Sequence, residues 1–518
     1  MGDVNITILD GGASIAVPVS TTQLVLGVCA LSKAATPVST FQIVATTNPS
    51  TLYSYVGPGP LAEAGGLSAL AGGTVLAIPL PVTTKGTATA PVLSQGTGAS
   101  LGTVGASGIT TTLDSTYGAY DDYYVQVAFP TGGTVSTAGI QFQLSLDAGR
   151  TFGPVLNLGT SATYIIPNTG ITLNFGAGTI VAGNVCKFST VAPAPSDADI
   201  NTAIGVYKAS PYALAGVGTI HIVGVYAGTD IALMSNGSTG YLDVLKNQNV
   251  YNRAIISVRD AGAPAAWGGS GESEPAWMTA IETNASSTIT GNDGKRLSVN
   301  AGYYNTQTAF PTTVCGTPSY RRPLSWSLAA RQVIIPPQRH AGRVKDGALS
   351  TIVVNPSSDP TDGFIYHDER IKPGLDAARF SSATTRLQKG AGFFIKNPNL
   401  MSLPGSVFTI LPLGLVMDVA CTIVFAVGQN EIDDDIRTLP SGTLYPSDAL
   451  ALQNAFDAAL QADMVSQNML SSEQTVVDQT NNVALTSTVN VGVTLQARGY
   501  VLKENITIGY TTGSQAGG

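Results

Sequence analysis

The chain has 518 residues, a formal net charge of −8 and only 11% charged residues, whereas soluble proteins usually carry about 25%. Because one hydrophobic core rarely serves more than about 300 residues, we expect two or three domains. No cluster of Lys and Arg exceeds the pairs Lys295-Arg296 and Arg321-Arg322, which argues against direct binding of nucleic acid. A surface with few charges resists association poorly, so the composition favours a subunit of a large assembly, although low-charge extracellular β-proteins share it.

The usual signals for a membrane span, secretion or a metal site are missing from the sequence. No stretch of about 18 uninterrupted apolar residues occurs, so we predict no membrane insertion. The N-terminal sequence MGDVNITILDGG lacks the basic flank and apolar stretch of a secretory signal, and we expect synthesis and residence in the cytoplasm. The cysteines are far apart, without a CxxC pair or a histidine at metal spacing, which argues against a disulfide framework or a zinc site: Cys29, Cys186, Cys315 and Cys421.

The N-terminal part predicts an arm followed by an α/β region. In residues 3–9 the apolar side chains Val4, Ile6 and Ile8 alternate with polar ones, which is the period of a half-buried strand. Residues 23–31 form a continuous apolar run, which is typical of a strand buried on both faces. We therefore assign residues 1–20 to an N-terminal arm.

The middle of the chain predicts a β module inserted into an α/β domain. Residues 86–195 are rich in Gly, Thr and Ser and alternate at 123–127 and 140–144, which predicts a peripheral all-β module. Residues 197–214 predict a short helix. Apolar runs at 221–226, 253–258 and 331–335 predict further buried strands, so residues 21–85 and 196–372 make up one discontinuous α/β domain.

The last third, residues 373–518, predicts one clear helix and two strands. The helix runs from Ser447, which can cap it, to about Met464, with apolar residues at i, i+3 and i+4 spacing and Asp457 and Asp463 on the wetter side. Alternating strands follow at 489–495 and 505–510, the second with Ile506, Ile508 and Tyr510 on one face. The predicted fold class is a mixed, multi-domain α+β protein.

Residues 145–152, SLDAGRTF, resemble an Asp box, S-x-D-x-G-x-T-F/W. In such a box the Asp side chain binds backbone donors of a hairpin turn, the Gly supplies a positive φ and the aromatic ring packs underneath. Sialidases carry several boxes and a cluster of arginines, whereas this chain has one box and no such arginine set. We interpret it as a structural turn, and a glycan-binding or glycan-cleaving protein remains the less favoured alternative.

The remaining chemistry favours a protein that is not an enzyme and uses no cofactor or metal. The motifs GxSxG, HExxH and GxxxxGK[ST] are absent, and His221, His340 and His367 lie in unrelated contexts. The tetrad of residues 367–370, HDER, is interpreted as a salt-bridged surface or subunit contact in preference to an acid/base pair. The acidic run at residues 431–435 is interpreted as a solvated loop or an electrostatic contact in preference to a cation site.

The order of these segments resembles the contractile tail sheath proteins of phages and related injection machines. The resemblance covers most of the chain and is one of order and texture. It is carried by residues 4–8 and 23–30, by Phe41 and the passage YSYVGPGPL at 53–61, by the helix at 449–464, and by the strands at 489–495 and 505–510.

The resemblance implies a C-terminal α/β sheath domain, residues 373–518, that lines the sheath against a tail tube. Arms at residues 1–20 and from about 500 would add strands to neighbouring subunits, building stacked hexameric rings whose contraction drives the tube through a host envelope. The arm residues are Val4, Ile6, Ile8, Ile506, Ile508 and Tyr510, and the residues expected to face the tube are Asp433, Asp434, Asp435, Asp457 and Asp463.

The partners implied are further copies of the chain, a tail tube protein, and baseplate and tail terminator proteins, in a virion tail assembled in the host cytoplasm. Another virion component, such as a baseplate, fibre or capsid-decorating protein, is the main alternative.

Overall fold

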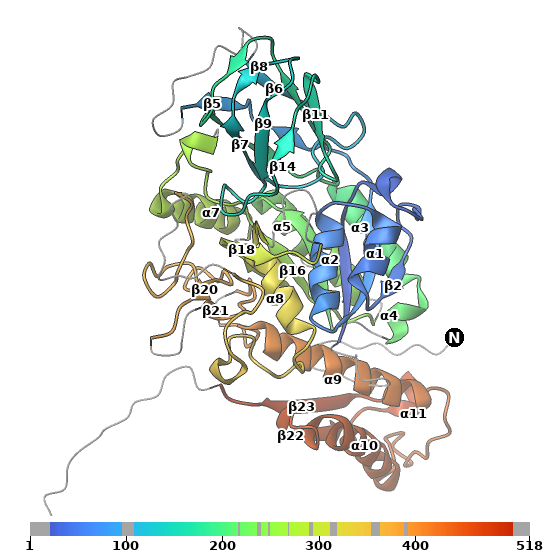
Figure 1. Ribbon diagram of the computed structural model, residues 1–518. Coiled ribbons are helices and arrows are strands. Elements are labelled where there is room, and N and C mark those ends of the chain that lie inside the picture. Colours follow the sequence, from blue (N-terminus) through green and yellow to red (C-terminus); the bar gives the residue numbers. More distant parts are fainter. Residues whose placement is uncertain are drawn as a thin grey trace, which may run out of the picture.

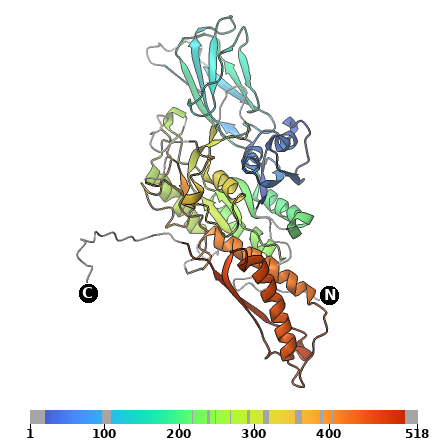
Figure 2. The ribbon, with the colours of Figure 1, turned by 60° about the horizontal axis from the view of Figure 1, so that its bottom comes forward.

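The computed structural model describes residues 21–95, 108–215, 218–235, 240–246, 249–267, 269–289, 294–310, 319–353, 363–387, 392–403 and 405–500. They form a mixed α/β structure with several sheets. Figure 1 shows a β module (residues 87–191) above a central α/β domain, with a C-terminal unit (residues 411–497) below it. Seen from below, this C-terminal unit projects from the rest of the molecule (Figure 2).

The central domain is built on a six-stranded sheet with the order β17-β16-β15-β1-β3-β2. All neighbours in it are parallel except β2, which runs antiparallel at one edge. The predicted strands at 23–31, 221–226 and 253–258 are confirmed as β1, β15 and β16. The strands are β1 Thr22–Val28, β2 Val44–Thr46, β3 Thr74–Leu80, β15 Thr219–Val225, β16 Ala254–Ser257 and β17 Leu297–Asn300.

Helices cover both faces of this sheet, which is why its strands are apolar on both sides. Val25 and Val75 face one layer of helices, whereas Leu24 and Leu76 face the other. The first layer contains α1 Pro49–Val56, α2 Pro60–Leu70 and α8 Leu324–Gln332. The second contains α3 Asp197–Lys208, α5 Gly228–Ser235, α6 Tyr241–Lys246 and α7 Glu274–Ile289, and α4 Pro211–Ala215 follows α3.

The passage at residues 53–61 joins α1 to α2 beside the end of β1. Gly59 has a φ of 139°, and a side chain there would bring a Cβ to 2.8 Å from the Cα of Cys29. Pro60 then occupies the first turn of α2, where its missing N–H costs no hydrogen bond. The glycine and proline thus allow the second helix to start directly against the sheet.

Residues 297–411 complete the central domain. The apolar residues Phe393, Leu400 and Leu411 share one core with Ile255 of β16, so the predicted boundary at residue 373 falls inside this region. Its short elements are the hairpin β18 Tyr303–Gln307 with β19 Ser319–Pro323, the pair β20 Ala383–Thr384 with β21 Phe394–Ile395, and the turns η1 Leu31–Lys33, η2 Ala265–Trp267 and η3 Val344–Asp346.

The predicted strand at 331–335 is wrong. Arg331 and Gln332 are the last residues of α8, and the chain turns after them. A short apolar run cannot distinguish a strand from a buried helix end, and here Leu324 and Leu328 already set the helical period.

The β module consists of strands and loops in its described residues, around a core that includes Val125, Phe142 and Phe188. One sheet has the order β10-β9-β7-β14-β4, with β5 also on β14; a second is β11-β12-β6; and β13 pairs with β8. The strands are β4 Thr87–Ala88, β5 Val92–Ser94, β6 Ile109–Leu113, β7 Tyr124–Thr131, β8 Gly133–Thr134, β9 Gln141–Ser145, β10 Leu156–Asn157, β11 Thr163–Ile166, β12 Ile171–Phe175, β13 Thr179–Ile180 and β14 Val185–Val191.

The C-terminal unit packs two long helices against a two-stranded antiparallel sheet. It contains α9 Leu411–Asn430, α10 Pro446–Leu460, the π-helical turn η4 Gln461–Val465, β22 Leu470–Val477, α11 Val483–Thr486 and β23 Val491–Ala497. The predicted helix is confirmed, but Ser447 does not cap it. The helix begins at Pro446, whose ring removes one of the N–H groups that a cap would serve, and Ser447 instead accepts a hydrogen bond from Arg437.

Helix α9 was not predicted from the sequence. Among the described residues, it is the one helix that is long and apolar enough, by length and composition, to cross a membrane. Of its most apolar stretch of 18 residues, 61% is buried inside the protein. Asp418 interrupts its apolar run and binds Arg253, 3.0 Å away. Leu411 and Leu415 belong to the core of the central domain, and Val419 and Ile423 to that of the C-terminal unit, so α9 connects the two.

Candidate assembly surface

The sheet of β22 and β23 has two edges, and the edge of β23 is the more open of the two. Among the described residues, β23 pairs with no strand other than β22. The outer edge of β22 is partly occupied, because the backbone N–H of Thr475 donates to the Asp457 carboxylate of α10 at 3.0 Å. The free edge of β23 therefore offers the longer row of backbone donors and acceptors to another chain.

The register between β22 and β23 determines which backbone N–H groups of β23 point toward the open edge. Thr475 lies directly opposite Val493. In an antiparallel pair, opposed residues either exchange both their hydrogen bonds or direct both outward. Since the N–H of Thr475 points away from β23, the N–H of Val493 points away from β22, toward the open edge.

Protection against edge pairing is missing from β23. Natural edge strands are usually blunted by charges, prolines or bulges. Residues 489–497 contain no charged residue and no proline. Val493 and Leu495 pack against the core of the C-terminal unit, whereas Thr494 and Gln496 are exposed, and the register shift of this ladder lies on β22, between Leu470 and Ser472.

The chain leaves the open strand along the central domain. Arg498 donates to the Asn468 carbonyl at 2.9 Å, and the Tyr500 hydroxyl donates to the Gln338 carbonyl at 2.8 Å. The predicted arm residues lie outside the described residues: Val4, Ile6, Ile8, Ile506, Ile508 and Tyr510.

The acidic residues predicted to face a tube do not form one cluster. Residues 433–435 are exposed in the loop between α9 and α10. Asp457 is half-buried in the last turn of α10, and Asp463 lies beyond its end, roughly 22 Å of helix from the first turn at 1.5 Å per residue. The same loop also carries a positive charge, that of Arg437, which pairs with Asp448 of α10.

The Asp box has the predicted turn geometry. Asp147 is buried, and its Oδ1 accepts from the Ser145 hydroxyl at 2.7 Å and from the Thr151 N–H at 2.9 Å. Its Oδ2 accepts from the Thr151 hydroxyl at 2.6 Å, and Gly149 has a φ of 82°. Phe152 differs from the expectation, since it is 37% exposed instead of packed beneath the turn. Both carboxylate oxygens of Asp147 are engaged in the turn, as the interpretation of a structural turn expects.

Three residues of the tetrad at 367–370 are buried, and only Arg370, which lies 3.8 Å from Asp368, is exposed as a surface contact would be. His367 is fully buried, with Nδ1 2.9 Å from Glu274 Oε1 and Nε2 3.0 Å from Glu369 Oε2. Glu369 also accepts from the backbone N–H groups of Gly374 and Asp376. Burial opposes the charged ring, but the hydrogen bonds to the two carboxylates outweigh it and raise the pKa of His367. The network links Glu274, the first residue of α7, to the backbone at Gly374 and Asp376. The sequence did not predict it, because Glu274 is 93 residues away from His367.

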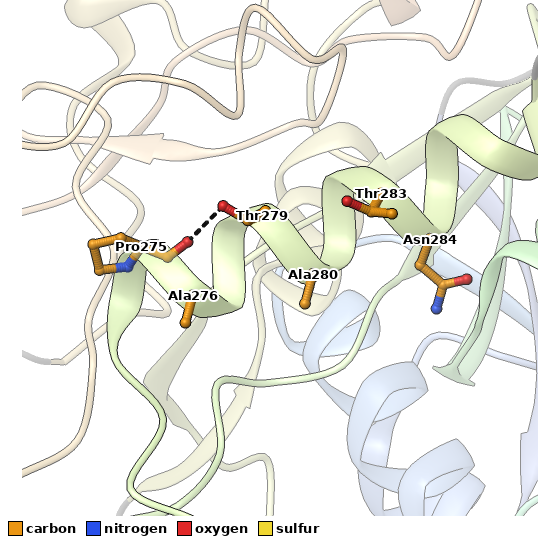
Figure 3. Close-up of a pocket in the computed structure, with 6 residues that line it drawn as sticks. All are labelled: Pro275, Ala276, Thr279, Ala280, Thr283 and Asn284. Atoms are coloured by element: carbon orange, nitrogen blue, oxygen red, sulfur yellow. Dashed lines mark hydrogen bonds between the residues drawn. The ribbon is translucent and has the colours of Figure 1, made fainter.

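An open groove of about 670 Å³ lies along α7 (Figure 3). Its lining is small and uncharged, and the Thr279 hydroxyl donates to the Pro275 carbonyl at 3.0 Å. None of the lining side chains is an acid or a base, so the groove offers no side chain for general acid–base catalysis. The lining residues are Pro275, Ala276, Thr279, Ala280, Thr283 and Asn284.

The ionisable side chains of the described residues offer no metal centre. Within the ranges given above, no group of three or more His, Cys, Asp or Glu is placed to hold a metal ion. The described cysteines Cys29, Cys186 and Cys421 are free and buried.

No protein-family model and no curated protein matches the chain. A crystal structure of the sheath tail protein from Desulfitobacterium hafniense matches with a TM-score of 0.42 and 9% identity, covering 96% of this chain and 100% of that one. This protein is similar in structure to a tail sheath protein. The contracted sheath complex of the extracellular contractile injection system PVC matches 64% of this chain and 77% of its own with a TM-score of 0.38 and 9% identity. Likenesses at these TM-scores assign no role to any residue of this chain.

Proposed function

We propose that this protein is the structural subunit of a contractile tail sheath. The observation that carries the proposal is the open edge of β23, a strand without charge or proline on a unit that projects from the body of the molecule. An edge of this kind gains main-chain hydrogen bonds when another chain adds a strand to it. The resemblance of the segment order to sheath proteins supports the same function.

In this proposal the terminal arms of neighbouring subunits supply the added strand. Residues 4–8 and 505–510 both alternate between apolar and polar side chains, as a strand lying on a half-buried edge requires. Repeated addition links subunits into stacked hexameric rings around a tail tube, with baseplate and terminator proteins at the ends. The protein acts by assembly and contraction in a virion tail, where it drives the tube through the host envelope, and not by catalysis.

A matched pair of substitutions at one position tests the open edge. Val493→Pro removes an N–H that points outward, so it spares the pairing with β22 while blocking the added strand. Val493→Ala loses comparable packing but keeps the N–H. We expect Val493→Ala to form long polymers and Val493→Pro to remain as folded subunits, as seen by electron microscopy and circular dichroism.

The two variants also separate the alternatives. Equal polymer formation by Val493→Pro and Val493→Ala would exclude strand addition at β23. A baseplate, fibre or capsid-decorating protein would instead give closed or trimeric particles with both variants.

A further inference from the structure

The β module is joined to the central domain by two chain segments that pair with each other. Thr84 and Ala194 form an antiparallel bridge, with the N–H of each donating to the carbonyl of the other at 2.9 Å. If these two linkers were the only connection, the module could rotate about them relative to the central domain. Contacts elsewhere on the module decide whether it can rotate in this way.

The side chains of Arg321 and Arg322, which are successive residues of β19, point in opposite directions, as successive side chains of a strand do. Arg321 turns to the central domain and holds both carboxylate oxygens of Asp260, at 2.6 and 2.8 Å. Arg322 enters the module, where it donates to Asp121 Oδ2 at 2.9 Å and to the Asp122 carbonyl at 2.6 Å. The side chains of Arg322 and Asp121 are each only 2% exposed, so this ion pair is sealed from water.

Apolar packing surrounds the buried pair. Tyr320, the residue before Arg321, is part of the hydrophobic core of the module and lies 5.6 Å from the ring of Tyr123. The ring of Tyr124 lies 4.4 Å from Phe364 of the central domain, and the Ser189 hydroxyl donates to the Trp267 carbonyl at 3.0 Å. The core of the module is therefore continuous with a strand that belongs to the other domain.

A separate contact is made by the turn η1, at the end of β1. Lys33 Nζ lies 3.2 Å from Asp114 Oδ2, and the N–H of Ser32 donates to the Tyr117 hydroxyl at 3.0 Å. The two linkers at Thr84 and Ala194, the strand β19 and the turn η1 are different elements of the fold. No single swinging motion about the linkers keeps the contacts to β19 and to η1 intact.

We propose that the β module is a rigid arm of the subunit, fastened by the insertion of Arg322 beside Asp121, so that the module and the central domain turn as one body. A partner held by the module would then experience every rotation of the central domain. This inference does not depend on the sheath function, because it concerns one subunit.

Distance measurements between spin labels on the two bodies test the proposal. Thr163 of β11 and Asn201 of α3 are both exposed, and labels at Thr163→Cys and Asn201→Cys are placed in a Cys315→Ser background, since the other cysteines are buried. We expect one narrow distance distribution. A broad or two-peaked distribution would overturn the proposal.

Three further variants test the role of Arg322 itself. Arg322→Met should broaden the distribution, whereas Arg437→Met, the same change at an exposed ion pair of the C-terminal unit, should leave it narrow. If Arg322→Met does not fold, Asp121→Asn removes the charge of the partner with little change of shape, and it should also broaden the distribution. A folded Arg322→Met or Asp121→Asn variant with the width of the parent would overturn the assignment of the fastening to this pair.

Discussion

The buried residue His367 shows how a group can look like a surface contact in sequence and serve as an internal cation in the fold. Both of its ring nitrogens face carboxylates, Glu274 on one side and Glu369 on the other. A neutral imidazole has one N–H and can donate to only one of them, so the doubly protonated ring fits the site. Lys372, 2.8 Å from Glu274, completes the charge balance.

This geometry predicts a loss of stability as the pH rises. Because the pKa of His367 is raised in the folded protein, the folded state holds its proton more tightly than the unfolded state. The resulting stability is fully present below the ordinary histidine pKa of about 6.5 and is lost as the pH rises through the folded pKa. His367→Asn should flatten this part of the profile in urea unfolding measured at a series of pH values. Parallel profiles for the parent and the variant would contradict the role of His367.

At the scale of single elements, the strands of the central sheet could be predicted because continuous apolar runs such as residues 23–31 report burial on both faces. Helix α10 could be predicted from its own periodicity. Helix α9 could not, since its buried residues face two cores and leave almost no polar side to mark a period. The surroundings of Asp418 and His367 depend on partners that are distant in sequence, such as Arg253, and no local pattern carries that information.

The acidic residues of the C-terminal unit carry a prediction at the same scale. We expect that replacing Asp433, Asp434, Asp435, Asp457 and Asp463 by Asn weakens growth of the polymer on purified tubes and spares polymers formed without tubes. Exposed charge contacts are worth only about 0.2–1 kcal/mol each and are screened by salt, which suits a tube that must be held and then released. Asn at 457 retains an oxygen that can accept from the Thr475 N–H, so the fold should tolerate it.

Sheath growth measured by turbidity and electron microscopy, with and without tubes, checks this prediction. A variant with only Asp457→Asn is measured alongside it, and it separates the effect of this half-buried carboxylate, which accepts from the Thr475 N–H, from the effect of the other four. Equal loss in both assays, or no loss in either, would show that these residues do not contact the tube.

At the scale of the whole molecule, the structure combines a β module that is fixed to the central domain with a strand edge, that of β23, that has no strand neighbour among the described residues. The β module is fastened by buried contacts from separate elements, and α9 shares its apolar residues between the central domain and the C-terminal unit. The open edge of β23 lies at the other end of the molecule from the module (Figure 1). In the proposed sheath, a rotation of the central domain would also turn the module, and strand addition at β23 would link the subunit to its neighbours.

The central claim is that this chain assembles with itself into a helical polymer, and negative-stain electron microscopy of the purified full-length protein over a range of concentrations tests it most directly. The account predicts hollow tubes with regular helical striations that lengthen as the concentration rises. Closed or trimeric particles, or single subunits at every concentration, would contradict it.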